Sequence, residues 1–113
     1  MDVRTSLEQL LADGRDSATL RFALGSECLK QGEADLAVRH LSAALQMDPA
    51  YSAAWKLLGQ AQIELGRRAE AKASYVRGIE VARARGDEQA AREMQVFLRR
   101  LERESDQGPP EQA

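Results

Sequence analysis

Large and small residues recur along this chain of 113 residues with a period of about 34 residues. A shift by one period, which we call the repeat shift, superimposes glycines on glycines and large apolar residues on residues of the same kind. The coinciding pairs are Leu24 and Leu58, Gly25 and Gly59, Gly32 and Gly66, Ala37 and Ala71, Leu41 and Tyr75, Ala44 and Gly78, and Leu45 and Ile79. A fixed period of this length indicates stacked repeats, each of which buries its apolar face only against its neighbours.

Between the glycines the apolar residues recur at helical spacing, so each copy of the pattern predicts a pair of helices. Two antiparallel helices approach closely only where small residues meet, and large residues fill the space beside those contacts. The composition agrees, because strong helix formers dominate and aromatic residues make up only 4% of the chain. Val, Ile and Thr are too scarce to supply a sheet, so we expect an all-α fold.

The expected folded domain covers residues 1–104, and a polar, proline-rich tail at 105–113 is predicted to be disordered. Residues 1–14 should form an N-terminal helix, 18–51 the first repeat, 52–85 the second repeat and 86–104 a capping helix. Inside the repeats we expect helices over about 17–31, 33–47, 51–65 and 67–85, each ending near a glycine or before Pro49.

The pattern resembles the tetratricopeptide repeat family, whose units carry Trp-x-x-Leu-Gly-x-x-Tyr in the first helix and Ala-x-x-x-Phe-x-x-Ala in the second. The second repeat supplies the matching residues Trp55, Leu58, Gly59, Ala71, Tyr75 and Gly78. The sequence departs from the family at Arg21, which replaces Trp, and at Cys28 and Gln62, which replace Tyr. Arg83 stands where the family has Pro, so the second helix of that repeat should be longer or the turn after it looser.

The resemblance implies a right-handed α-α superhelix of two full repeats with an extra helix at each end. The N-terminal helix aligns with the second half of a repeat, since Val3, Leu7, Leu10 and Leu11 fall on Ala37, Leu41, Ala44 and Leu45 after one further shift. The arrangement is similar to small stand-alone bacterial proteins of the family. It implies a non-enzymatic protein–protein interaction module, in which the first helix of each repeat lines a concave groove for a peptide or helix of a partner.

Family positions carried over onto this chain predict the residues of that groove. They are Thr19, Phe22, Ser26, Leu29, Lys30, Lys56, Gln60, Ile63, Glu64, Met94 and Phe97. Phe22, Leu29 and Ile63 are apolar at positions that the hairpins do not need for their own packing, which makes them candidate anchors for a partner. In the alternative reading, the terminal helices fold over this face and use it as core.

Two other functions stay open at this point. The chain could self-associate as a structural or assembly protein, as a homodimer through the groove or through an apolar face of the last helix formed by Met94, Phe97, Leu98 and Leu101. A weaker alternative is a nucleic-acid or phosphate binder using the basic fifth helix with Arg67, Arg68 and Lys72. Nucleic acid is disfavoured, because the net charge is −2 and no aromatic residues alternate with the arginines.

Composition removes several further classes of function. One cysteine, Cys28, cannot form an internal disulfide, and one histidine, His40, cannot build a Cys/His zinc site. No phosphate loop, catalytic triad or acid/base carboxylate pair is present, so we expect no metal, no cofactor and no catalytic residues. No apolar run approaches the roughly 18 residues that a membrane helix needs, and the start of the chain is polar. We therefore expect a cytoplasmic protein.

Overall fold

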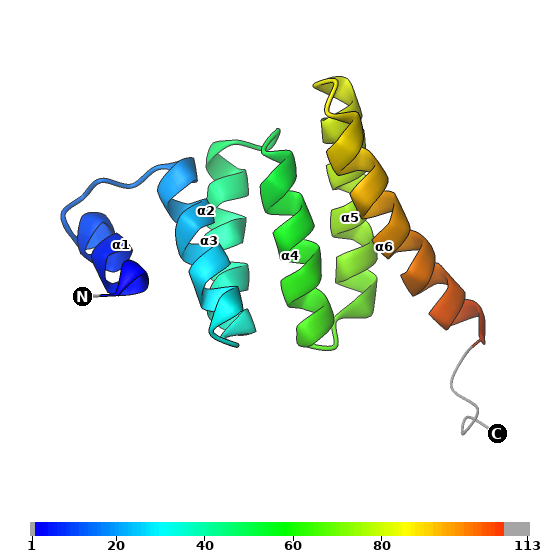
Figure 1. Cartoon of the computed structure of the whole chain (residues 1–113), viewed down its shortest axis with the longest axis horizontal. Helices are drawn as coiled ribbons and strands as arrows, with labels where there is room; N and C mark the ends of the chain where they lie inside the picture. The colour runs from blue at the N-terminus through cyan, green and yellow to red at the C-terminus, as the bar shows by residue number, and fades with distance from the viewer. Residues whose placement is uncertain (1, 108–113) are drawn as a thin grey trace.

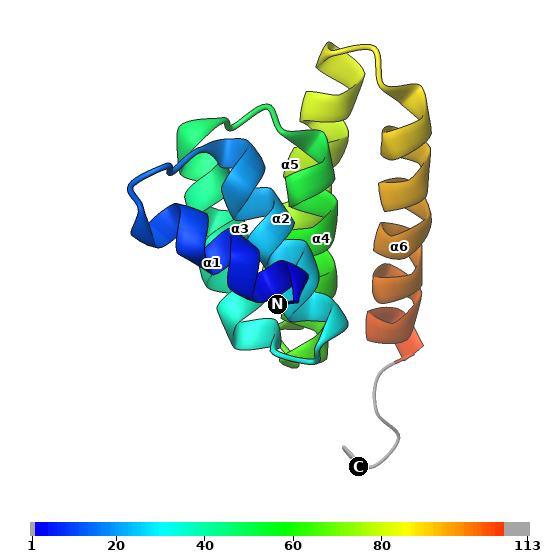
Figure 2. The same ribbon diagram turned by 60° about the vertical axis from the view of Figure 1, so that its left-hand side comes forward.

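The computed structural model of the chain describes residues 2–107. It consists of helices stacked in sequence order: α1 (Val3–Ala12), α2 (Ala18–Lys30), α3 (Ala34–Met47), α4 (Ser52–Glu64), α5 (Arg68–Ala84) and α6 (Glu88–Gln107). α2 pairs with α3 and α4 pairs with α5 as two antiparallel hairpins, and α6 packs on α5 (Figure 1). α1 lies against α2 at the opposite end of the stack (Figure 2). The predicted all-α repeat architecture is confirmed.

Local sequence explains where the helices begin and end. The side chains of Asp2 and Ser17 accept hydrogen bonds from the backbone N–H groups of Thr5 (2.7 Å) and Leu20 (3.0 Å), which caps α1 and α2. The turns inside both hairpins place Gly32 and Gly66 at φ of +79° and +75°. A residue with a Cβ would be strained in this left-handed conformation, and so the same glycine recurs after each first helix.

The close approach of the two helices in each hairpin depends on one glycine. A Cβ on Gly25 of α2 would lie 2.6 Å from Cγ of Leu41 in α3, and a Cβ on Gly59 of α4 would lie 2.5 Å from Cε1 of Tyr75 in α5. Leu41 and Tyr75 are both fully buried. Each pair therefore sets how closely the two helices of its repeat approach each other.

The core extends through the stack as two adjoining clusters, one formed by the first hairpin and α4, and one between α5 and α6. Trp55 of α4 packs against both clusters, and its indole N–H donates to the backbone oxygen of Pro49 at 2.8 Å. This side chain consequently ties the turn between the hairpins to the core of both repeats.

The second repeat departs from the first at its end. α3 has 14 residues, whereas α5 has 17 and passes through Arg83, where no proline stops it. The starts of α2 and α4, at Ala18 and Ser52, are one repeat shift apart. A further repeat shift would start α6 at residue 86, but α6 begins two positions later, at Glu88. The predicted lengthening of α5 is confirmed, and α6 is displaced from the repeat by these two positions.

The last helix is also longer than the sequence predicts. α6 runs to Gln107, beyond the expected end of the folded domain at residue 104. Leu101 is only 3% exposed, so its packing on the core holds this end of α6 in place. The polar residues 105–107 extend the same helix beyond it. The remainder of the predicted tail, 108–113, lies outside the described residues.

Candidate functional site

Two adjoining hollows lie where α2, α4 and α6 face one another on the side of the stack that the repeat predicts to be the groove. The larger, of about 460 Å³, is bounded by the start of α2, the turn before α4 and the turn before α6. The smaller, of about 250 Å³, lies between α4 and α6. Ala53 and Asp87 border both hollows, so the two lie side by side. We call this surface, with its lining residues, the groove.

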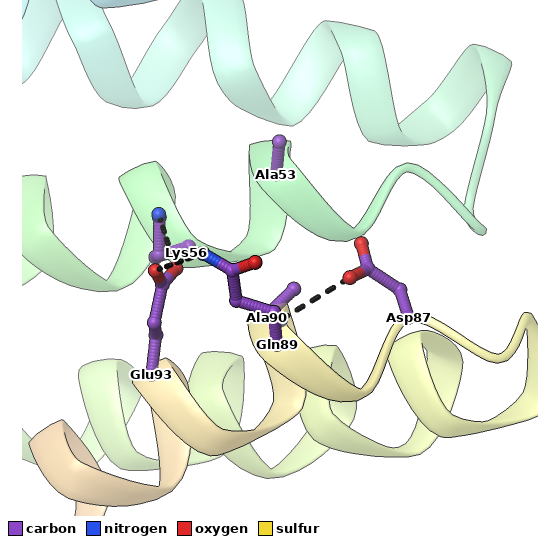
Figure 3. A pocket seen from close by; sticks show the side chains of 6 residues that line it. All are labelled: Ala53, Lys56, Asp87, Gln89, Ala90 and Glu93. Carbon is purple, nitrogen blue, oxygen red and sulfur yellow. Dashed lines mark hydrogen bonds and ion pairs between the residues drawn. The ribbon is translucent and has the colours of Figure 1, made fainter.

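An ion pair crosses the smaller hollow (Figure 3). Nζ of Lys56 in α4 lies 2.9 Å from Oε1 of Glu93 in α6, and the amide of Gln89 donates to the other carboxylate oxygen at 3.4 Å. The hydrogen bond from Lys56 and its positive charge lower the pKa of Glu93. Both side chains keep substantial exposure, 29% for Lys56 and 43% for Glu93, so a ligand can reach either charge.

Backbone turns supply most of the wall of the larger hollow. Asp87 caps α6 by accepting the N–H of Ala90 at 3.2 Å, and it also accepts the hydroxyl of Ser52 at 3.4 Å. Arg85 donates to the backbone oxygen of Ala50 at 2.7 Å, which joins the turn before α6 to the turn before α4. The lining therefore combines carboxylates with a guanidinium rather than presenting one sign of charge.

The apolar residues predicted as anchors keep part of their surface free while they pack on the core. Phe22 of α2 stacks on Tyr51, with ring centroids 4.9 Å apart and an interplanar angle of 26°. Phe22 and Leu29 contact the first core cluster, and Ile63 contacts the second. All three are half-buried. Each is thus a packed side chain with one remaining open face, rather than a side chain free in solvent.

The structure brings some predicted groove residues together directly. Thr19 lines the larger hollow and Lys56 the smaller. Among the other residues predicted on α2 and α4, the polar ones remain at least partly accessible; they are Ser26, Lys30, Gln60 and Glu64. Lys30 and Glu64 are the last residues of α2 and α4, so they lie at the ends of these helices.

The prediction for α6 was wrong at Met94. This side chain is fully buried, and its sulfur would lie 2.5 Å from a Cβ on Gly78, so it belongs to the core between α5 and α6. The reason is the displacement of α6, which places Met94 at the position of Leu24 and Leu58. Phe97 is half-buried and stacks on Tyr75 with centroids 5.6 Å apart, which leaves it one open face at most.

Sequence reasoning missed several residues that do line the groove. Gln89 could have been predicted, because a helix that begins at Glu88 places Gln89 at the position that Ala53 takes in α4 and Thr19 takes in α2. Glu93 was not among the positions carried over from α2 and α4. The turns add a further set of lining residues, where a pattern based on the first helices makes no prediction; they are Asp48, Tyr51 and Arg85.

The terminal helices do not cover this groove. α1 packs on α2 at one end of the stack, and α6 packs on α5 and α4 at the other, where it forms the third wall (Figures 1 and 2). The reading in which both helices fold over the face and use it as core was therefore wrong for the two hollows, although α6 takes up part of the face, because Ile63 packs against the cluster between α5 and α6. The apolar face expected to hold a second copy is also occupied, because Met94 and Leu101 are buried within the chain.

The basic residues of α5 have partners along the chain. Arg68 pairs with Glu104 of α6, Arg77 lies 3.3 Å from Glu80, and Arg83 donates to Gln95 at 3.1 Å. The carboxylates of Glu104 and Glu80 offset the positive charge of Arg68 and Arg77, which weakens the case for a basic nucleic-acid-binding face on α5.

Cys28 and His40, the other candidate residues, pack within the described part of the chain. Cys28 is buried, which raises the pKa of its thiol, and His40 lies 3.2 Å from a guanidinium nitrogen of Arg21. Across residues 2–107 no cluster of His, Cys, Asp and Glu could hold a metal ion. Over the same residues no helix is both long and apolar enough to cross a membrane.

Comparison with known proteins agrees with the geometry. The profile of the tetratricopeptide repeat family matches residues 28–93. A TPR repeat-containing protein of Pseudomonas aeruginosa, PA0015, is 47% identical over 97 residues, which cover 86% of this chain and 92% of that protein.

Solved structures share most of the stack. The solution structure of protein BPP2914 from Bordetella parapertussis is 45% identical with a TM-score of 0.81, over 91% of this chain and 90% of that one. The crystal structure of a tetratricopeptide repeat domain protein from Salinibacter ruber is 31% identical with a TM-score of 0.72, over 77% and 97%. Tetratricopeptide repeats generally mediate protein–protein interactions and are typically not catalytic. The chain belongs to the tetratricopeptide repeat family.

Proposed function

We propose that this protein is a non-enzymatic interaction module that binds a peptide or helix of a partner protein in the groove between α2, α4 and α6. The observation that carries the proposal is the pair of adjoining hollows, whose lining comes from three successive first helices and the turns before them. A ligand lying across these helices would contact all the repeats at once. The surface therefore suits an extended or helical segment better than a small molecule.

The chemistry of the lining supports a polypeptide ligand. Lys56 and Glu93 offer one charge of each sign, and neither is so buried that separating them would leave an unpaired charge in the core. Outside the lining of the two hollows, the half-buried side chains of Phe22 and Ile63 add apolar surface on α2 and α4. A segment with apolar side chains between charged ones would complement both features.

The experiment selects short peptides from a phage-displayed random library on the immobilised protein and measures the affinity of the best peptide by calorimetry. Thr19→Arg fills the larger hollow from its rim, and Lys56→Met removes the cation of the smaller one. The double variant Phe22→Glu with Ile63→Glu disrupts the apolar faces. We expect each change to weaken binding at least tenfold, about 1.4 kcal/mol or more.

The matched control is Val76→Glu, which introduces the same charge at a valine 47% exposed on α5. This variant should bind the peptide within twofold of the unchanged protein. Thr19→Arg and Lys56→Met keep the test decisive if the double variant fails to fold, as checked by helical circular dichroism. The proposal is wrong if the selected peptides bind both of these groove variants with unchanged affinity.

A further inference from the structure

Among the described residues the stack begins with α1, and the repeat shift aligns this helix with α3, the second helix of a repeat. α1 packs against α2 at the end of the stack, on the side where α3 packs against α4 in the next repeat, but it crosses α2 more steeply and makes less contact with it (Figure 2). The repeat shift places Val3 on Ala37, Leu7 on Leu41 and Leu10 on Ala44. The residues of α3 at these positions belong to the core cluster of the first hairpin, and Leu41 packs against Gly25 of α2.

The apolar residues of α1 are more exposed than the residues at the same repeat positions in α3. Ala37, Leu41 and Ala44 are all fully buried, whereas Val3 is 60% exposed, Leu10 is 40% exposed and Leu7 between them is half-buried. No residue of α1 is buried. We call Val3, Leu7 and Leu10 the open stripe of α1, because it presents apolar side chains where the repeat places a neighbouring helix.

We propose that the open stripe binds an amphipathic helix of a partner protein, antiparallel to α1, in the position that the first helix takes beside the second in each repeat. This site is separate from the groove and goes beyond the proposed function. The chain provides the template for the complex twice, in the contacts that α2 makes with α3 and α4 makes with α5.

The contacts within the two hairpins also predict which residues the partner helix needs. Leu7 stands where Leu41 stands in α3, and Leu41 requires a glycine opposite it, at a Cβ distance of only 2.6 Å. Leu10 stands where α5 has Gly78, and a Cβ on Gly78 would lie 2.7 Å from Cβ of Trp55. Leu10 has a large side chain where α5 has none, so the partner helix must carry a small residue at the position of Trp55. The partner helix therefore needs two small residues four positions apart.

A second copy of this chain does not fit the stripe. Its α6, displaced from the repeat, has Gln95 at the position of Gly59, so it cannot approach Leu7 closely. Two α1 helices packed antiparallel would place leucine on leucine and would bring Asp2 of one copy near Asp13 of the other. Like charges at both ends oppose that arrangement, and the same carboxylates favour a partner helix with basic residues near its ends.

The probe is a synthetic peptide with the sequence of residues 17–32, carrying Arg21→Ala and Cys28→Ala and held helical by a hydrocarbon staple on its outer face. It presents Ala and Gly four positions apart, as the template requires. A control peptide carries Gly25→Leu in addition. Each is titrated to millimolar concentration into the ¹⁵N-labelled protein, and amide shifts are recorded for the unchanged chain and for Leu10→Glu.

We expect saturating shifts centred on α1, with an affinity at least tenfold lower for Leu10→Glu and for the control peptide. Val96→Glu, a matched change at a valine 53% exposed on α6, should leave the affinity within twofold. The inference is overturned if the shifts are absent or map to α2, α4 and α6. It is also overturned if the α1 amides shift with protein concentration alone, because a second copy would then be the occupant.

Discussion

The ring of Tyr75 in α5 lies so close to Gly59 in α4 that a Cβ at residue 59 would stand 2.5 Å from Cε1 and 2.6 Å from Cζ of the ring. Tyr75 is fully buried, and burial raises the pKa of its hydroxyl to about 12. The rigid ring cannot move away without disturbing Phe97, which stacks on it at 5.6 Å. This contact sets the spacing of the second hairpin.

The first prediction concerns Gly59→Ala. Helix propensity alone would make the variant more stable by about 1 kcal/mol, whereas overpacking a core contact costs about 1–3 kcal/mol. We expect the steric cost to dominate, so urea unfolding should show a net loss of free energy of unfolding. Ala73→Gly, at an exposed position of α5, measures the propensity effect in the same protein. A Gly59→Ala variant more stable than the unchanged chain would contradict the packing argument.

A second prediction concerns the turn between the second repeat and α6. Arg83→Pro places proline inside α5, which runs on to Ala84, and should cost about 3 kcal/mol or more. Pro49→Ala changes a residue outside any helix and should cost much less. Thermal unfolding of both variants checks the difference. Equal stability of the two would show that α5 ends before residue 83 in solution.

How much could be predicted from the sequence is clearest in these same residues. The repeat period correctly predicted the partners of Gly25 and Gly59, because each small residue and its large neighbour lie inside one hairpin. It failed at Met94, because the period itself changes once proline is missing at residue 83. Glu93 and Arg85 were missed because their roles depend on how α6 and the turns lie in space, which no local pattern encodes.

A third prediction concerns pH and His40. Burial, followed by the nearby charge of Arg21, lowers the pKa of His40 below its usual value of 6.5. The unfolded chain therefore binds this proton more tightly than the folded chain, so neutral His40 stabilises the fold above about pH 6.5. That contribution should be lost as the pH falls through the lowered pKa.

Denaturant unfolding from mildly acidic to mildly basic pH tests this directly. His40→Gln should flatten the dependence of stability on pH in this range, and Arg21→Gln should raise the pKa of His40 in an imidazole NMR titration. A His40 pKa at or above its ordinary value in the unchanged protein would refute the assignment.

A fourth prediction concerns the ion pair across the smaller hollow. The hydrogen bond from Lys56 lowers the pKa of Glu93, and Lys56→Met should raise it toward the ordinary value for glutamate. A carboxyl ¹³C titration of both proteins measures the change. Glu93→Gln should leave the fold intact because the pair is partly exposed. An unchanged Glu93 pKa in Lys56→Met would mean that the pair does not form in solution.

An amide shift map of the ¹⁵N-labelled protein with the peptide selected from the phage library shows directly whether the groove binds a polypeptide. We expect the largest shifts at residues lining the two hollows, including Thr19, Ala53, Lys56, Gln89 and Glu93. Residues on the outer face of α3 and α5, such as Val76, should not move. Shifts confined to α3 and α5, with none along the groove, would show that the groove is not the binding site.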